Sequence, residues 1–308
     1  MGRLEIKIGS LLLSPPIMPA SGTFGYGDEV KEFFDYKDIG AIVTKGLSLK
    51  PRKGNKMPRI TETPSGMINA IGLENIGFER FIKEKIPFYR KIKKPVIVNI
   101  FGESLDEFLQ ITERLDEFKE VSGFEINISC PNVDKGGIEF SKTPDTVRTL
   151  IKEIRKRTKK FITVKISPDS DYITISKICE EEGTDAITAI NTIRAMEIDI
   201  YTRTSKISRI FGGLSGPAIK PIALRIVYEI SKAVSIPVIG VGGISSWEDA
   251  VQFFIAGASA VQIGTCFFVN NNIFKEIKGG LEEFLRKRRT SIKNLIGSFK
   301  NHFPLLNN

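Results

Sequence analysis

Short runs of β-branched and other apolar residues alternate along the chain with longer segments whose apolar residues recur every three or four positions. The short runs predict buried strands, and the longer segments predict amphipathic helices. We expect strands at 17–19, 41–44, 96–100, 124–128, 161–166, 186–190, 237–240 and 260–263. The predicted helix faces consist of Leu105, Phe108, Leu109, Leu115 and Phe118; of Val147, Leu150, Ile151 and Ile154; of Ile222, Ile226, Val227 and Ile230; and of Trp247, Ala250, Val251 and Phe254.

This alternation predicts an α/β fold, because strands separated by helices pair in parallel. Eight such units in about 250 residues are typical of a TIM (β/α)8 barrel. Gly183 and Gly257 each stand between a predicted helix and the next strand, where a helix C-cap glycine is expected. No linker rich in Pro, Gly or Ser interrupts the chain, so we expect a single domain over 1–308. The irregular segment 50–76 is expected to fold over the C-terminal mouth of the barrel.

Composition narrows the class of protein. The net charge of +9 is moderate, and the basic residues fall in helical patterns without interleaved aromatic residues, which argues against nucleic-acid binding. No 18-residue apolar run is present, so no membrane-spanning helix is expected. The three cysteines are odd in number and form no CxxC motif, which favours a reducing cytoplasm and argues against a disulfide, an iron–sulfur cluster or structural zinc in this chain.

Polar residues gather where the predicted strands end. In TIM barrels the chemistry lies at the C-terminal ends of the strands. A single asparagine there is typical of an ordinary turn, but four asparagines and two lysines together indicate a site. The asparagine amide both donates and accepts hydrogen bonds, which suits the imide-like edge of a flavin or a pyrimidine. These strand-end residues are Ser21, Lys45, Asn99, Asn127, Lys165, Asn191 and Thr192, with Asn69 added from the 50–76 segment.

Glycines follow the last two predicted strands. Gly242 and Gly243 come after the seventh strand, and Gly264-Thr265 comes after the eighth. Glycines at these places allow backbone N–H groups to approach a phosphate. The pattern is not a dinucleotide-binding fingerprint, because that motif belongs to an early βαβ unit with a downstream acidic residue.

A thiol is the leading candidate for proton transfer, because the only histidine is His302, close to the end of the sequence. Cys130 lies in the segment Asn127-Ile128-Ser129-Cys130-Pro131-Asn132, just after a predicted strand, and the following Gly136-Gly137 loop is a candidate lid. Cys179 falls in a helical apolar pattern and is expected to be buried packing. Cys266 follows Thr265 and is also expected to be structural.

Together these residues resemble the class 1 dihydroorotate dehydrogenases, and more narrowly the type B catalytic subunit, over roughly residues 3–300. The cysteine at the base position separates the chain from the membrane-bound class, which uses serine, and Gly136-Gly137 is similar to type B. The motifs that carry the resemblance are Pro19-Ala20-Ser21-Gly22-Thr23, Thr44-Lys45-Gly46, Asn69-Ala70-Ile71-Gly72-Leu73-Glu74-Asn75, 127–132, Asn191-Thr192, Gly212-Gly213-Leu214-Ser215-Gly216-Pro217 and 240–244.

The resemblance implies FMN-dependent oxidation of (S)-dihydroorotate to orotate in pyrimidine (UMP) biosynthesis, with one FMN per chain. Cys130 is then the base that removes the C5 proton, while hydride from C6 passes to flavin N5. The implied substrate-binding residues are Lys45, Asn69, Ala70, Ile71, Gly72, Leu73, Asn127, Asn191 and Thr192. The implied FMN-binding residues are Ser21, Lys45, Gly46, Asn99, Asn127, Lys165, Ile190, Gly216, Gly242, Gly243, Gly264 and Thr265.

The resemblance also implies partners. Type B enzymes pass electrons to NAD⁺ through a second subunit that carries FAD and a 2Fe–2S cluster, so a homodimer within a heterotetramer is expected. Three other enzymes remain alternatives: a fumarate-linked type A enzyme, a Schiff-base aldolase with Lys165 as nucleophile, and a uracil or thymine dehydrogenase, against which Lys45 argues because those substrates lack a carboxylate. A barrel that only binds leaves the polar strand ends unexplained.

Overall fold

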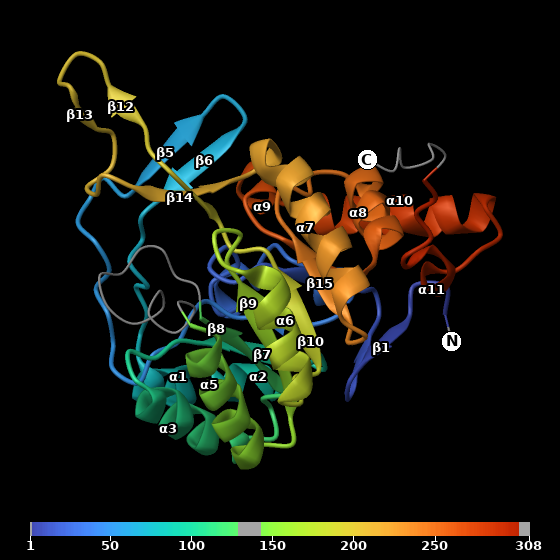
Figure 1. Cartoon of the computed structure of the whole chain (residues 1–308), viewed down its shortest axis with the longest axis horizontal. Helices are drawn as coiled ribbons and strands as arrows, with labels where there is room; N and C mark the ends of the chain where they lie inside the picture. The colour runs from blue at the N-terminus through green and yellow to red at the C-terminus, as the bar shows by residue number, and fades with distance from the viewer. Residues whose placement is uncertain (1, 129–142, 302–308) are drawn as a thin grey trace.

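A sheet of eight parallel strands forms the centre of the computed structural model, which describes residues 2–128 and 143–301 (Figure 1). The strands are β3 (Ile17–Pro19), β4 (Ile42–Val43), β7 (Val96–Ile100), β8 (Gly123–Asn127), β9 (Phe161–Ile166), β10 (Ala186–Ala189), β15 (Val238–Val241) and β16 (Ala258–Ile263). Every predicted strand is present, with its ends within two residues of the predicted positions.

The sheet closes on itself. Strand order is β3-β16-β15-β10-β9-β8-β7-β4, so each strand lies beside its neighbours in the chain and the first strand pairs with the last. The Gly40 N–H, just before β4, donates to the Ile17 carbonyl of β3 at 2.8 Å and joins the two edge strands. The predicted TIM barrel is therefore confirmed, and the continuous apolar strands are those of a parallel sheet covered on both faces.

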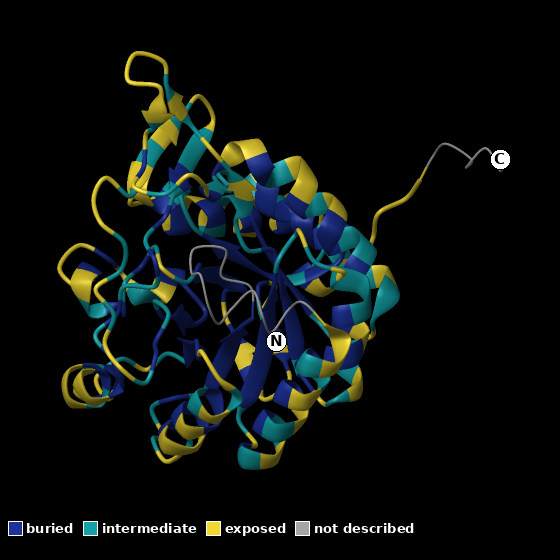
Figure 2. Ribbon diagram, turned by 60° about the vertical axis from the view of Figure 1, so that its left-hand side comes forward, coloured by how far each residue is buried: buried dark blue, intermediate teal, exposed yellow. Residues whose placement is uncertain are grey.

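Helices surround the barrel and turn their apolar faces inward, while their outer faces are exposed (Figure 2). The prediction that Ile222 belongs to a buried helix face is wrong. Ile222 is 42% exposed, and Ala223 takes the buried position beside Ile226. Phe118 was predicted to lie on a helix face, but the helix ends at Asp116, two residues before it.

The helices are α1 (Phe78–Glu84), α2 (Ile86–Tyr89), α3 (Leu105–Asp116), α5 (Pro144–Arg157), α6 (Tyr172–Glu181), α7 (Lys220–Ala233), α8 (Trp247–Ala256), α9 (Cys266–Val269), α10 (Ile273–Lys287) and α11 (Ile292–Leu295), with 3-10 turns η1 (Asp28–Val30), η2 (Tyr36–Asp38) and η3 (Pro217–Ile219).

Two predicted glycine caps are confirmed. Gly183, after α6, has φ of +85°, and Gly257, at the end of α8, has φ of +124°. The Gly257 N–H donates to the carbonyls of Phe253 and Phe254, which closes the last turn of α8. A side chain at either position would be strained in this left-handed region, so glycine ends each helix before the following strand.

The 50–76 segment folds into a hairpin, β5 (Ile60–Thr63) and β6 (Gly66–Asn69), as part of a second sheet. Its order is β11-β14-β6-β5, where β11 (Ile193–Ala195) and β14 (Gly212–Ser215) come from a segment after β10. An arm formed by β12 (Ile198–Asp199) and β13 (Thr204–Ser205) extends from this sheet (Figure 1). The sequence predicted the excursion of 50–76 but none of the strands from β11 to β14. A further unpredicted hairpin, β1 (Ile6–Ile8) with β2 (Leu11–Leu13), precedes the barrel.

We predict that Ser104→Ala lowers the free energy of unfolding by about 1 kcal/mol, measured by urea denaturation. Ser104 is the N-cap of α3, and its side chain accepts a hydrogen bond from the Glu107 N–H at 3.3 Å. Ser291→Ala is the matched control, because Ser291 is the N-cap of α11 but its side chain makes no capping hydrogen bond. Equal losses in the two variants would contradict the assignment.

Candidate functional site

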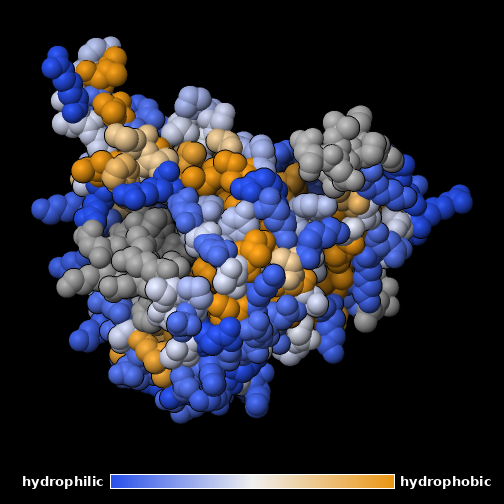
Figure 3. Space-filling view, viewed as in Figure 1, coloured by the Kyte–Doolittle hydropathy of each residue, from blue (hydrophilic) through white to orange (hydrophobic). Residues whose placement is uncertain are grey.

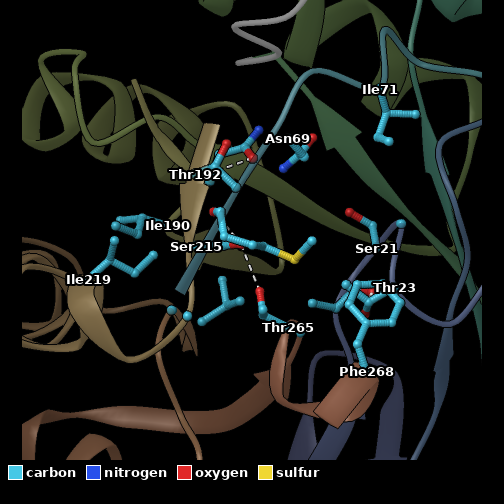
Figure 4. A pocket seen from close by; sticks show the side chains of 18 of the residues that line it. Ser21, Thr23, Asn69, Ile71, Ile190, Thr192, Ser215, Ile219, Thr265 and Phe268 are labelled. Carbon is cyan, nitrogen blue, oxygen red and sulfur yellow. Dashed lines mark hydrogen bonds between the residues drawn. The ribbon is translucent and has the colours of Figure 1, made fainter. Parts of the chain in front are cut away.

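The strand-end residues meet in one cavity of about 330 Å³ at the C-terminal end of the barrel (Figure 4). It lies between the strand ends and the second sheet, whose β6 and β14 also supply lining residues. The predicted site residues that line it are Ser21, Lys45, Gly46, Asn69, Ile71, Gly72, Leu73, Asn99, Asn127, Lys165, Ile190, Asn191, Thr192, Gly216, Gly242, Gly243, Gly264 and Thr265.

Among the described residues, one predicted site residue does not line the cavity. Ala70 is fully buried with Ile68 and Ile207 in a small apolar cluster of its own. Its backbone is also engaged, since its N–H donates to the Arg59 carbonyl and its carbonyl accepts from Asn55 Nδ2. Cys130, like the Gly136-Gly137 loop and His302, lies outside the described residues.

The floor of the cavity is polar and buried. Lys165 Nζ, on β9, donates to Ser21 Oγ at 3.0 Å. Asn127 Nδ2, on β8, donates to Asn99 Oδ1 of β7 at 3.5 Å. Asn127 stands directly beside Lys165 in the parallel register, so strand pairing brings these side chains together. The floor thus combines one cation with two amides, each of which can donate or accept.

Below the floor lies a carboxylate that sequence reasoning missed. Glu125 is completely buried and accepts hydrogen bonds from Asn99 Nδ2 and Gln262 Nε2, both at 2.7 Å. Its carboxylate also lies 3.7 Å from Lys165 Nζ. A signal was available: Glu125 and Asn127 are two positions apart on one strand, so they share a face of the sheet.

One wall of the cavity is made of glycine backbone. Gly216, Gly242 and Gly243 have φ values of +96°, +132° and +72°. A Cβ atom on Gly243 would lie 2.9 Å from the Gly216 carbonyl oxygen and 2.7 Å from the Lys220 nitrogen. Only glycine permits this approach of two loops. Nearby, Thr265 Oγ1 hydrogen-bonds to Ser215 Oγ at 2.7 Å (Figure 4).

Asp249 anchors the loop that follows these glycines. Its carboxylate accepts hydrogen bonds from the Ser245 and Ser246 N–H groups and from Lys220 Nζ, the last at 2.6 Å. Burial alone would raise the pKa of the Asp249 carboxyl, but Lys220 and the Ser245 hydrogen bonds hold it below its usual value. Because Ser246 is also the N-cap of α8, the helix start and the glycine wall form one hydrogen-bonded unit.

The wall opposite carries charge and apolar surface from the 50–76 segment. Lys45 Nζ lies 3.7 Å from the Glu74 carboxylate, which also forms an ion pair with Arg59. Both Lys45 and Glu74 line the cavity. Ile60 and Met67 line it as well, and neither was predicted, because a short exposed hairpin gives no sign of which distant side chains it faces.

Comparisons with known proteins show the family of this chain. A family model described as dihydroorotate dehydrogenase matches residues 3–285. The chain belongs to the dihydroorotate dehydrogenase family. Curated relatives include proteins named dihydroorotate dehydrogenase B (NAD(+)), catalytic subunit, from Thermodesulfovibrio yellowstonii, at 52% identity over 96% of this chain and 99% of the relative, and from Trichlorobacter lovleyi, at 49% identity over 96% and 98%. The family resemblance read from the sequence is therefore confirmed.

A solved structure shows the same fold. A crystal structure of DHODH in complex with ferulenol, from Eimeria tenella, matches with a TM-score of 0.81 over 96% of this chain and 88% of that one, at 22% identity. Among the described helices of this family member, none is long and apolar enough to cross a membrane. The described residues also contain no group of three or more His, Cys, Asp or Glu side chains placed to hold a metal ion.

The two cysteines within the described residues are poor nucleophiles. Complete burial raises the pKa of the Cys179 thiol to about 12. Burial, together with the Glu276 and Asp249 carboxylates, also raises the pKa of the Cys266 thiol. A raised pKa means that the reactive thiolate is present only at higher pH. The expectation that Cys179 is buried packing is confirmed.

We predict that at pH 8 iodoacetamide alkylates Cys179 in the folded protein at least about 100-fold more slowly than in urea, because the thiolate fraction is small and the thiol is enclosed. Cys266 is expected to react more slowly than in urea by a smaller factor. Peptide mass spectrometry after timed quenching measures each site separately. Equal labelling rates for Cys179 in the folded and unfolded chain would contradict the burial described here.

Proposed function

We propose that this chain is an FMN-dependent dehydrogenase that oxidises (S)-dihydroorotate to orotate in pyrimidine biosynthesis, and that it works as a single FMN-binding barrel domain. The observation that carries the proposal is the convergence of strand-end amides, two lysines and a glycine wall on one cavity. Membership in the dihydroorotate dehydrogenase family and the names of the curated relatives support it.

The donor set of the cavity fits FMN. The glycine wall lets backbone N–H groups come close to a phosphate, as the loops after the seventh and eighth strands of many barrels do. A Cβ atom on Gly46 would come within 3.1 Å of Asn99 Oδ1, so a side chain there would press on Asn99. The proposed FMN-binding residues are those named above from the resemblance, of which all line the cavity. Bound FMN supplies a two-electron acceptor.

The other side of the cavity fits a small anionic ring. Lys45 provides a cation for a carboxylate, and Asn69, Asn127 and Asn191 provide paired donors and acceptors for an imide edge. Asn69 is itself oriented, since its Nδ2 donates to the Gly213 carbonyl at 3.3 Å. The described side chains thus bind and orient the substrate. The proton at C5 is assigned to Cys130 from the sequence motif alone.

The electrons taken from dihydroorotate must pass from the flavin to an electron acceptor. Curated relatives are named as the catalytic subunit of an NAD(+)-linked enzyme. We therefore propose a partner subunit carrying FAD and a 2Fe–2S cluster, joined to a homodimer of this chain. An exposed surface on the β12–β13 arm supports the assembly; it includes Ile198 at 51%, Ile200 at 74% and Tyr201 at 90% exposure. Figure 3 shows hydrophobic residues, in orange, on this arm. Cytoplasmic location follows from the same proposal.

An anaerobic titration with dihydroorotate tests the proposal. The purified chain is expected to be yellow, and one equivalent of dihydroorotate per flavin is expected to bleach the absorbance near 450 nm, a general property of reduced flavins. NAD⁺ added alone is expected to leave the protein bleached, and NAD⁺ with the partner subunit to restore the colour. Restoration by fumarate alone would indicate type A. A colourless protein whose lysine is trapped by borohydride would replace the proposal with the aldolase.

We predict that Cys130→Ala retains FMN but slows reduction by dihydroorotate by about 10² to 10⁴-fold, the usual loss when a positioned base is removed. Anaerobic stopped-flow absorbance measures this step directly. Cys179→Ala is the matched control, because it removes a thiol from the buried face of α6, outside the cavity. Near-normal reduction in Cys130→Ala would refute its role.

A further inference from the structure

A charged side chain stands at the centre of the barrel, one layer below the cavity. Glu125 lies on β8 and Gln262 on β16, and these strands are four places apart whichever way the barrel is followed. The 2.7 Å hydrogen bond between their side chains therefore crosses the interior from one side to the other. Glu125 and Gln262 are 0% and 1% exposed, and neither is among the residues that line the cavity.

The same carboxylate contacts the cavity floor from beneath. Glu125 accepts from Asn99 Nδ2 at 2.7 Å and lies 3.7 Å from Lys165 Nζ. Asn99 and Lys165 both line the cavity. They in turn hydrogen-bond to Asn127 and Ser21, which also line it. One buried charge is thus within one or two contacts of four residues of the floor.

The carboxylate also decides which way the amides point. An ionised carboxylate only accepts hydrogen bonds, so both amides must turn their NH2 groups toward it. Asn99 consequently directs its carbonyl oxygen to Asn127. For Gln262 the consequence is a cost, because its buried Oε1 has no hydrogen-bond partner among the described residues. A buried acceptor without a partner calls for an explanation, and the ordering of Asn99 on the other side of the carboxylate offers a functional one.

We propose that Glu125 is a positioning residue: it fixes Asn99 and Lys165 under the cofactor and reduces the net positive charge that Lys165 presents there. The inference rests on the proposed flavin function. A cation near the flavin favours its reduced, negatively charged form, so a carboxylate beside that cation holds the reduction potential lower than Lys165 alone would set it.

Glu125→Gln isolates the charge from the packing. The new amide has nearly the same shape, and it can donate to Gln262 Oε1 if the Gln262 amide turns over, which keeps one hydrogen bond across the interior. The fold and flavin content are therefore expected to be kept. Relative binding of reduced over oxidised flavin is expected to rise about tenfold, which is a positive shift of about 30 mV in the two-electron potential. Reducing the bound flavin together with a reference dye of known potential measures this shift.

Two controls separate charge from structure. Glu125→Asp keeps the charge and is expected to have a potential closer to wild type than to Glu125→Gln. Thr163→Val removes another buried polar group of the barrel interior, where Thr163 and Thr188 hydroxyls lie 2.8 Å apart, and should leave the potential unchanged. An equal shift in Thr163→Val would overturn the proposal, because any loosening of the interior would then suffice.

A second variant covers the case in which Glu125→Gln does not fold. Glu125→Met with Gln262→Met replaces both sides of the central hydrogen bond by apolar chains of similar length, which buried sites often tolerate. The same positive shift is expected. If either folded variant has the wild-type potential and wild-type orotate affinity, Glu125 is structural only. A wild-type protein that binds no flavin would instead refute the proposed function itself.

Discussion

The buried carboxylate of Glu125 is the interaction on which the site is built. An isolated charge in a protein interior is costly, so it persists only with a full set of partners. Here those partners come from three other strands: Asn99 on β7, Lys165 on β9 and Gln262 on β16. Barrel interiors are usually filled by branched apolar side chains in layers. This chain places a polar layer among them, directly under the cavity, and the orientation of the floor follows from it.

The walls above that floor are fixed by different means. On one side, positive-φ glycines allow two loops to touch, and the Asp249 carboxylate secures them to the start of α8. On the other side, Glu74 and Arg59 of the 50–76 segment form a chain of ion pairs with Lys45, which follows β4. The side proposed for the cofactor is therefore backbone held by hydrogen bonds, while the side proposed for the substrate is made of side chains and charges.

The sequence predicted the barrel and its strand-end residues well, for a physical reason. Parallel strands buried on both faces are continuous apolar runs, and any polar residue at their C-terminal end must lie near the mouth. Gln262 was missed because a polar residue inside a strand looks the same whether it faces solvent or the barrel axis. Glu125 was missed because its two-residue spacing from Asn127 was not used. The strands β11 and β14 of the second sheet were not predicted, because β14 is rich in glycine and pairs with β6, far away in the chain. Ile222 fitted the helical period of apolar residues, but the buried face of α7 begins at Ala223 instead.

The pairings that enclose the cavity join residues that lie far apart in the chain. Ile17 of β3 pairs with Val261 of β16, and Asn69 of β6 pairs with Gly213 of β14. During synthesis the N-terminal partner in each pair must wait until most of the polypeptide has emerged from the ribosome. Neither the closed barrel nor the β6–β14 pairing can form before these C-terminal partners are synthesised. The cavity is therefore expected to form late in synthesis and in one step, rather than gradually as the chain grows.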